Sequence, residues 1–156
     1  IILPMNKIEN KVNRSIGRMI SILHRHAQAH HNHNLKDCGI NAKDLPILLY
    51  LYHHDGSTQD AIVGFLNIDK AAVTRTVQSL EERGFIIRNK AVEDRRCNHL
   101  HLTDRARLVE KDVRDSVKSW NALLTESMNM QTLSIIIDGL EAMVDKVETN
   151  KKGILK

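Results

Sequence analysis

The sequence contains few of the residues on which all-β and secreted proteins depend. Aromatic residues make up 3% of its 156 residues, and it has only seven glycines and two prolines. Strands favour aromatic and β-branched residues and need many turn residues between them, so a β-sandwich or β-barrel is disfavoured. Two cysteines without a CxxC motif provide no disulfide framework, which predicts a reducing, cytoplasmic location.

Long apolar runs and enzyme motifs are also missing. No run approaches the roughly 20 apolar residues that span a bilayer, so we expect no membrane partner. The sequence contains no GxGxxG, P-loop, GxSxG or HExxH motif. We therefore predict a single helical domain that is not an enzyme and requires no cofactor.

The charge that is present is unevenly distributed. The net charge is +4, but residues 37–68 carry one Lys or Arg against four acidic residues. Residues 69–107 carry nine basic residues against six acidic ones. A basic segment in the middle of the chain indicates an anionic partner.

Apolar residues recur every three or four positions in the first half of the chain, which indicates amphipathic helices. The stripe from Ile8 to Leu23 predicts a helix from about Asn6 to Ala29, and the polar segment His30 to Gly39 is typical of a loop. Three short helices are expected to follow: Leu45–Tyr52, one that starts at Ser57, and Lys70–Arg83 with Asp69 as its cap and Gly84 after its end.

The periodicity changes after Gly84. Phe85–Arg88 predicts a short strand, and Cys97–Leu102 alternates, with Leu100 and Leu102 on one face. The charged segment 89–96 between them predicts a hairpin tip. Thr103 is expected to cap a long helix to about Ser127, followed by a last helix with a heptad-like seam of Leu133, Ile137, Leu140, Val144 and Val147.

Two short helices joined by a tight turn and followed by a hairpin with a basic tip form a winged helix-turn-helix. The predicted fold is mainly α with a small β-hairpin wing and flanking helices at both termini. The second short helix fits the major groove, and the start of the preceding helix can hold a phosphate. The candidate DNA contacts are Ser57, Thr58 and Gln59, then Lys70, Ala71, Ala72, Thr74, Arg75 and Gln78, and finally Arg95 and Arg96 at the tip.

Residues 69–88 (DKAAVTRTVQSLEERGFIIR) and 93–107 (EDRRCNHLHLTDRAR) resemble the core of the MarR family of bacterial and archaeal transcriptional regulators. A leading helix and two trailing helices extend the resemblance over the whole chain. A wing without glycine, Ala106 in place of a frequent glycine, and Gly64 within a helix depart from the pattern. The matching features are Asp69, Val73-Thr74-Arg75, Leu80-Glu81, Gly84, Asp94-Arg95-Arg96 and Leu102-Thr103, with Thr58-Gln59 at the start of the helix-turn-helix.

The resemblance implies a homodimer that binds a pseudo-palindromic double-stranded DNA operator. It implies a helical dimerisation region, residues 1–36 and 120–156, and a winged helix-turn-helix domain, residues 37–119, connected by the long helix 103–127. In this family the arginine that matches Arg95 contacts the minor groove and Asp94 orients it, so Asp94→Ala should weaken DNA binding. The predicted function is a ligand-responsive transcriptional regulator that acts as a repressor. The sequence alone leaves an activator as an open alternative.

Three kinds of signal are compatible with this prediction. For a small aromatic effector, the candidate contacts between the dimerisation helices and the winged lobe are Arg18, Tyr50 and Tyr52. Thiol redox sensing would use Cys38 or Cys97, although peroxide sensors of the family keep their cysteine in the first helix, where this chain has none. Zinc sensing has His26, His30, His33 and Cys38 as weak candidates without a recognised ligand spacing.

The alternative to a DNA-binding regulator is a winged-helix module that binds another protein. The arginine-rich wing and the polar face of the second short helix disfavour it. The salt dependence of binding discriminates the two, because phosphate contacts weaken steeply with ionic strength.

Overall fold

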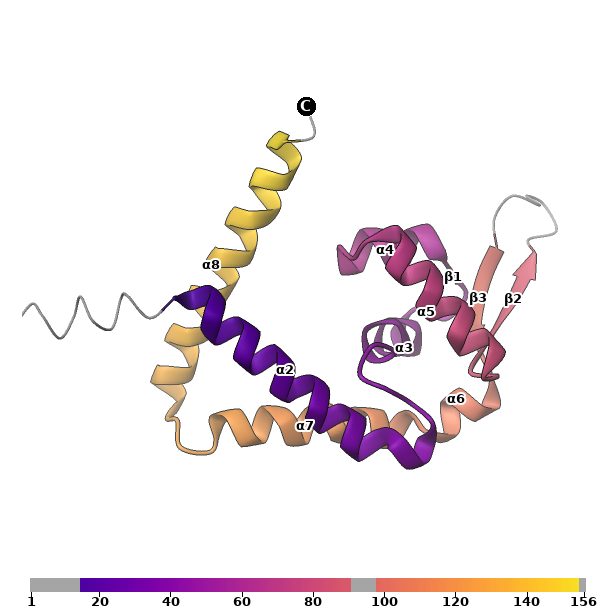
Figure 1. Ribbon diagram of the computed structural model, residues 1–156, viewed down its shortest axis with the longest axis horizontal. Coiled ribbons are helices and arrows are strands. Elements are labelled where there is room, and N and C mark those ends of the chain that lie inside the picture. Colours follow the sequence, from indigo (N-terminus) through magenta and orange to yellow (C-terminus); the bar gives the residue numbers. More distant parts are fainter. Residues whose placement is uncertain (1–14, 91–97, 155–156) are drawn as a thin grey trace, which may run out of the picture. The chain divides into compact units, whose positions relative to one another are not determined.

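The computed structural model describes residues 15–90 and 98–154 and is mainly helical with a small antiparallel sheet, which confirms the predicted fold class (Figure 1). No helix within these residues is long and apolar enough to cross a membrane. The helices are α2 (Ile16–Leu35), α3 (Leu45–His53), α4 (Gln59–Leu66), α5 (Lys70–Glu82), α6 (Asp104–Leu108), α7 (Glu110–Thr125) and α8 (Met130–Ile154); the strands are β1 (Ser57–Thr58), β2 (Ile86–Lys90) and β3 (Asn98–Leu102).

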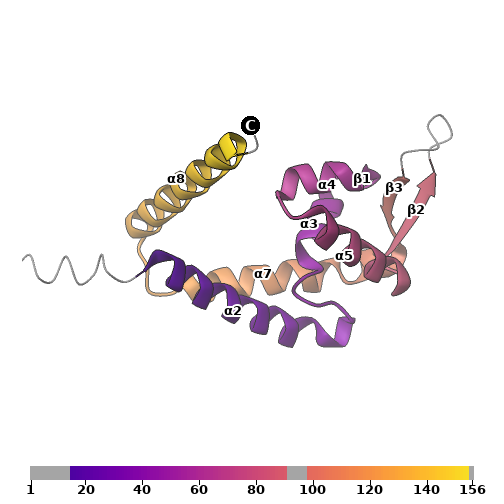
Figure 2. The ribbon, with the colours of Figure 1, turned by 45° about the horizontal axis from the view of Figure 1, so that its top comes forward.

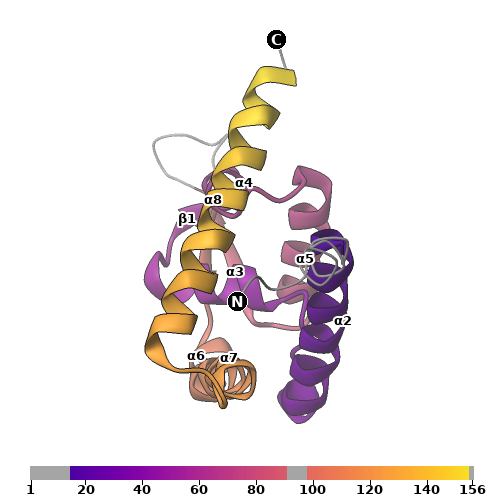
Figure 3. The ribbon, with the colours of Figure 1, turned by 90° about the vertical axis from the view of Figure 1, so that its left-hand side faces the viewer.

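The chain divides into two compact units, one that ends at Lys118 and one from Ser119 to Lys156. The first unit contains the sheet, α2 to α6 and the first part of α7. The second unit contains the last residues of α7 and the whole of α8, which Figure 3 shows as one long helix. The division into dimerisation and DNA-binding regions stays a prediction.

The core of the first unit lies between α3, α4, α5 and the sheet. Phe85 at the start of the hairpin and Leu48 and Leu51 of α3 are completely buried. The inward face of α5 consists of Val73, Val77 and Leu80, as the sequence predicts. This packing holds α5 against the rest of the unit and leaves its opposite face to solvent.

The sheet has the order β1-β3-β2, and Figure 2 shows β2 and β3 side by side as the hairpin. The register pairs Ile86 with Leu102 and Arg88 with Leu100. Leu100 and Leu102 are buried, which confirms the predicted alternation of this strand. β2 continues to Lys90, so the prediction of a tip from Asn89 was wrong by two residues.

The polar segment after Ala29 is helical, and the prediction of a loop from His30 was wrong. α2 continues to Leu35 because His31 and Leu35, four residues apart, are both buried and extend its inward face. His31 Nδ1 shares a hydrogen bond of 2.9 Å with Ser116 Oγ of α7. The polar side chains of Asn32, His33 and Asn34, which lie between these two buried residues, are exposed.

The predicted helix from Thr103 to Ser127 is interrupted. Thr103 caps it as expected, since its hydroxyl accepts a hydrogen bond from the amide of Ala106. Val109 then leaves the helical conformation, with φ −95° and ψ 0°, and separates α6 from α7. Ala106 and Val113 on the two sides of this break are both completely buried, so the apolar stripe itself continues.

The buried His31 predicts a dependence of stability on pH. Burial and the neighbouring His30 lower the pKa of His31 below its ordinary value of 6.5. Between the lowered pKa and 6.5 the unfolded chain binds more protons, so the free energy of unfolding falls as the pH falls through this range. We expect urea unfolding, followed by circular dichroism at one protein concentration, to show a smaller loss between about pH 7.5 and 5.5 in His31→Gln than in the wild type.

The exposed His33→Gln variant is the matched control, because it makes the same substitution in the same helix without changing the contact to Ser116. It should keep the wild-type pH dependence. An unchanged pH dependence in His31→Gln would contradict the proposed effect of burial.

Candidate DNA-binding surface

The helix-turn-helix consists of α4 and α5, joined by residues 67–69. Asn67 has a left-handed backbone with φ 52°, which ends α4. The carboxylate of Asp69 accepts a hydrogen bond of 2.9 Å from the amide of Ala72 and thereby caps α5. The structure confirms both the predicted cap of this helix and Gly84, with φ 75°, after its end.

The predicted base-reading residues lie on the outer side of α5. Ala72 is half-buried, and the other five are exposed: Lys70, Ala71, Thr74, Arg75 and Gln78. A helix with a small residue such as Ala71 near its start can approach base edges closely. The contact of each of these side chains with DNA stays a prediction.

Hydrogen bonds and an ion pair connect the start of α4 to the start of α5. The side-chain amide of Gln59 donates to Thr74 Oγ1 at 2.6 Å, and Thr74 Oγ1 donates to the carbonyl of Lys70 at 2.8 Å. Lys70 Nζ lies 2.8 Å from the Asp60 carboxylate on α4, and both side chains are largely exposed. The structure thus brings three predicted contact residues, from two helices, into one connected surface.

Arg75 differs from its neighbours on this surface. Gln78 donates a hydrogen bond of 2.9 Å to Glu82, and Lys70 is paired with Asp60. Within the part of the chain that the structure describes, no hydrogen bond or ion pair engages the Arg75 guanidinium. An unengaged, planar guanidinium can donate two hydrogen bonds to a guanine edge or to a phosphate.

The start of α4 lies two residues later than predicted. Ser57 and Thr58 pair with β3 as strand β1, and Thr58 is the N-cap, with its hydroxyl accepting from the amide of Ala61 at 3.2 Å. The Ser57 hydroxyl donates to the carbonyl of His54 at 2.7 Å. The extended backbone that joins the sheet therefore delays the helix, and both hydroxyls already have partners within the chain.

The predicted wing contacts Asp94, Arg95 and Arg96 lie outside the described residues. At the base of the wing, Arg88 Nε lies 2.8 Å from the Glu81 carboxylate. The hairpin is therefore connected to α5, the helix that carries the other candidate contacts.

The three candidate effector residues have different surroundings. Tyr52 is half-buried and its hydroxyl donates to the carbonyl of Ala106 at 2.8 Å. Burial raises the pKa of Tyr52 to about 12. Tyr50 packs its ring against His54 and Phe65, and Arg18 is exposed near the start of α2. Their role in effector binding stays a prediction.

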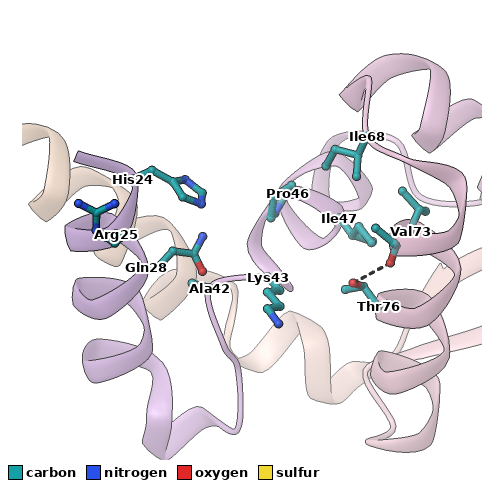
Figure 4. A pocket seen from close by; sticks show the side chains of 11 residues that line it. His24, Arg25, Gln28, Ala42, Lys43, Pro46, Ile47, Ile68, Val73 and Thr76 are labelled. Atoms are coloured by element: carbon teal, nitrogen blue, oxygen red, sulfur yellow. Dashed lines mark hydrogen bonds between the residues drawn. The ribbon is translucent and has the colours of Figure 1, made fainter. Parts of the chain in front are cut away.

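A cavity of about 530 Å³ lies between α2, α3 and α5. Figure 4 shows that side chains of all three helices line it. The sequence reasoning missed this site, although Arg25 follows Arg18 by seven residues and so shares its helix face. The lining residues are His24, Arg25 and Gln28 of α2, Ala42 and Lys43, Pro46 and Ile47 of α3, Ile68, and Ala72, Val73 and Thr76 of α5.

The weak metal candidates are not gathered into a site. Within residues 15–90 and 98–154, no group of three or more His, Cys, Asp or Glu residues could hold a metal ion. His30 pairs with Asn34 at 3.0 Å, and Cys38 Sγ donates to the Asp112 carboxylate at 3.6 Å. Burial and Asp112 raise the pKa of the Cys38 thiol, which disfavours the reactive thiolate. Cys97 lies outside the described residues.

Comparison with known proteins decides the family. The MarR family profile matches residues 40–98. An uncharacterized HTH-type transcriptional regulator of Bacillus subtilis, YdgJ, is 31% identical over 110 residues, which cover 70% of this chain and 66%, slightly less than two thirds, of that relative. Residues 40–98 are a MarR-family domain. MarR proteins are transcriptional regulators rather than enzymes, which confirms the exclusion of an enzyme.

Solved MarR structures share the fold over most of the chain. A MarR transcriptional regulator from Methanosarcina mazei has a TM-score of 0.77 and 29% identity, and the match covers 86% of this chain and 96% of that one. A MarR-family regulator from Listeria monocytogenes in complex with a 26mer DNA has a TM-score of 0.80 and 18% identity, with coverage of 88% and 91%. The latter shows that this fold accommodates DNA.

Proposed function

We propose that this protein is a homodimeric, sequence-specific DNA-binding repressor whose DNA affinity is controlled by a small molecule. The observation that carries the proposal is the outer side of α5, where the unengaged Arg75 lies beside exposed Thr74 and Ala71. A helix start of this composition suits the major groove, where Arg reads guanine and small residues contact the thymine methyl group. Because the proposed partner is chromosomal DNA, we expect the protein in the cytoplasm.

The proposal of a homodimer rests on apolar faces that each unit leaves uncovered. On α2, Ile16, Ile20 and Leu23 are 46–56% exposed. Apolar surface of this extent is typical of helices that pair with another chain. The corresponding face of α8 consists of Ile136, Ile137, Leu140, Met143, Val144 and Val147, which are 39–66% exposed.

Leu140→Glu tests the dimer directly, because it places a carboxylate in the middle of the apolar face of α8. We expect size-exclusion chromatography with light scattering to give the 17.8 kDa mass of one chain instead of twice that mass. Ala142→Glu is the matched control, since two residues along a helix turn a side chain by about 200°. A wild-type chain that elutes as a monomer would contradict the proposal.

The cavity between α2, α3 and α5 is the candidate effector site. Its lining combines an apolar floor, which includes Ile47, Ile68 and Val73, with the polar Gln28 and the basic Arg25. Such a mixture suits a small aromatic effector that carries a polar or anionic group. Val73 and Thr76 belong to α5, so an occupant of this cavity contacts the helix proposed to read DNA.

Selection of bound duplexes from a random-sequence pool tests the proposed DNA recognition without knowledge of the operator. We expect enrichment of an inverted repeat whose half-sites are centred about 10–10.5 base pairs, or a multiple of that distance, apart. Salt-sensitive binding without any enriched sequence would restrict the protein to non-specific DNA binding. No retained DNA would favour the protein-interaction module instead.

A further inference from the structure

A second cavity adjoins the first one along α5. It has a volume of about 380 Å³ and shares Lys43, Ala72 and Thr76 with the cavity between α2, α3 and α5. Arg75 and Ser79 line only the second cavity. Together the two adjoining cavities, called the groove here, extend from the apolar residues of the first cavity to Arg75, the residue proposed to read DNA.

The charges of this groove favour an anion. The basic side chains are Arg25 in the first cavity, Lys43 where the two cavities meet, and Arg75 in the second. Asp44 is the one acidic residue among the described residues that line the two cavities. Its carboxylate is neutralised by two hydrogen bonds from the Arg83 guanidinium, of 2.8 and 3.0 Å.

The larger apolar side chains all lie in the first cavity, together with the polar residues His24, Arg25 and Gln28. Ile47, Ile68 and Val73 line the first cavity only, whereas the polar residues Arg75 and Ser79 line only the second. A ligand with an apolar body at one end and hydrogen-bond acceptors at the other suits both cavities. An anionic group at the second end would receive charge-assisted hydrogen bonds, which are stronger than neutral ones.

We propose that the effector is an elongated amphiphilic anion whose apolar end occupies the first cavity and whose anionic group binds Arg75 in the second. Ligand and DNA then compete directly for one guanidinium. This inference rests on the proposed function, because Arg75 matters for regulation only if α5 binds DNA. It differs from regulation through a shift of the lobes, since binding of the two partners is mutually exclusive.

Ligand binding can be tested without DNA, by calorimetric titration of the full chain with 8-phenyloctanoate, benzoate and 8-phenyloctanamide. The first has an apolar end and a distant carboxylate, the second lacks the length, and the third lacks the charge. We expect 8-phenyloctanoate to bind the wild type at least tenfold more tightly than Arg75→Gln. Benzoate should bind both proteins equally, and the amide should lose the preference for the wild type.

Lys118→Gln is the control variant, because Lys118 is an exposed cation on α7 that lines neither cavity. It should bind 8-phenyloctanoate like the wild type. Equal affinity of 8-phenyloctanoate for the wild type and Arg75→Gln overturns the proposal, and so does the absence of binding at about 1 mM.

Competition with DNA distinguishes this proposal from the proposed function. Under direct competition the apparent Kd for DNA rises in proportion to the 8-phenyloctanoate concentration without a plateau, whereas allosteric coupling saturates at a finite factor. A plateau overturns direct competition and leaves DNA recognition intact. A chain that binds the anion through Arg75 but no DNA refutes the proposed function and leaves the anion site standing.

Discussion

Replacing Arg75 by alanine is expected to lower the affinity for a selected operator about 10- to 100-fold. The side chain is exposed at the outer side of α5 and has no partner within the described residues, so its guanidinium is available for a base edge. A bidentate contact between Arg and guanine contributes about 1–3 kcal/mol of discrimination. The loss should therefore be large for the operator and small for an unrelated duplex.

Arg75→Lys separates charge from geometry in the same measurement. Lysine keeps the positive charge but cannot donate two parallel hydrogen bonds from one plane. We expect fluorescence anisotropy to show that this variant retains binding to unrelated DNA but loses preference for the operator. Lys118→Gln, which removes a remote exposed cation, should preserve both. An operator affinity of Arg75→Ala equal to that of the wild type would refute the base-reading role.

Arg83→Ala is expected to produce the second large effect, on stability. Arg83 follows the last turn of α5, and its guanidinium makes two hydrogen bonds to Asp44, whose side chain is 2% exposed. A further hydrogen bond of 2.7 Å reaches the carbonyl of Gly39. Removal of the cation leaves a buried carboxylate without its partner, which typically costs about 3–5 kcal/mol.

Urea unfolding at a fixed protein concentration measures this cost. Lys111→Ala is the matched control, because its ion pair with Asp115 lies at the surface and its loss should change stability little. The double variant Asp44→Asn with Arg83→Gln should be less destabilised than Arg83→Gln alone, since no unpaired charge remains. A loss in Arg83→Ala no larger than in Lys111→Ala would show that the pair does not hold α5 in place.

Local signals in the sequence predict much of the winged lobe. The cap at Asp69, the glycine at position 84 and the apolar spacing of Val73, Val77 and Leu80 define α5 without knowledge of the fold. The alternation of apolar and polar residues predicts β3, because its apolar residues all face one core. In these elements the capping residues and the apolar spacing predict the same boundaries and the same buried face.

The errors arise where distant residues decide local structure. His31 is polar, but its contact with Ser116, 85 residues away, makes it part of a buried face and lengthens α2. Ser57 begins a strand rather than a helix because it pairs with Leu100. No local pattern contains these partners, so composition alone indicates a loop in the first case and a helix start in the second.

The candidate effector site was not predictable for a related reason. The groove is assembled from α2, the loop before α3, and α5, which are separated in the sequence and meet only in the folded lobe. The chemistry of Tyr50 and Tyr52 suits an aromatic effector, but packing directs the Tyr52 hydroxyl to the carbonyl of Ala106 and the Tyr50 ring to His54 and Phe65. The residue types in the sequence indicate what chemistry a site could offer. Which residues line the cavity depends on the tertiary structure.

Fluorescence anisotropy of the wild-type chain with its selected operator and with a scrambled duplex tests the central claim most directly. At about 50 and 200 mM salt, a protein that neutralises several phosphates loses affinity steeply for both duplexes. The account predicts operator binding at least about 1,000-fold tighter than binding to the scrambled duplex at the higher salt concentration. Equal, weak binding to both duplexes would contradict sequence-specific recognition by α5.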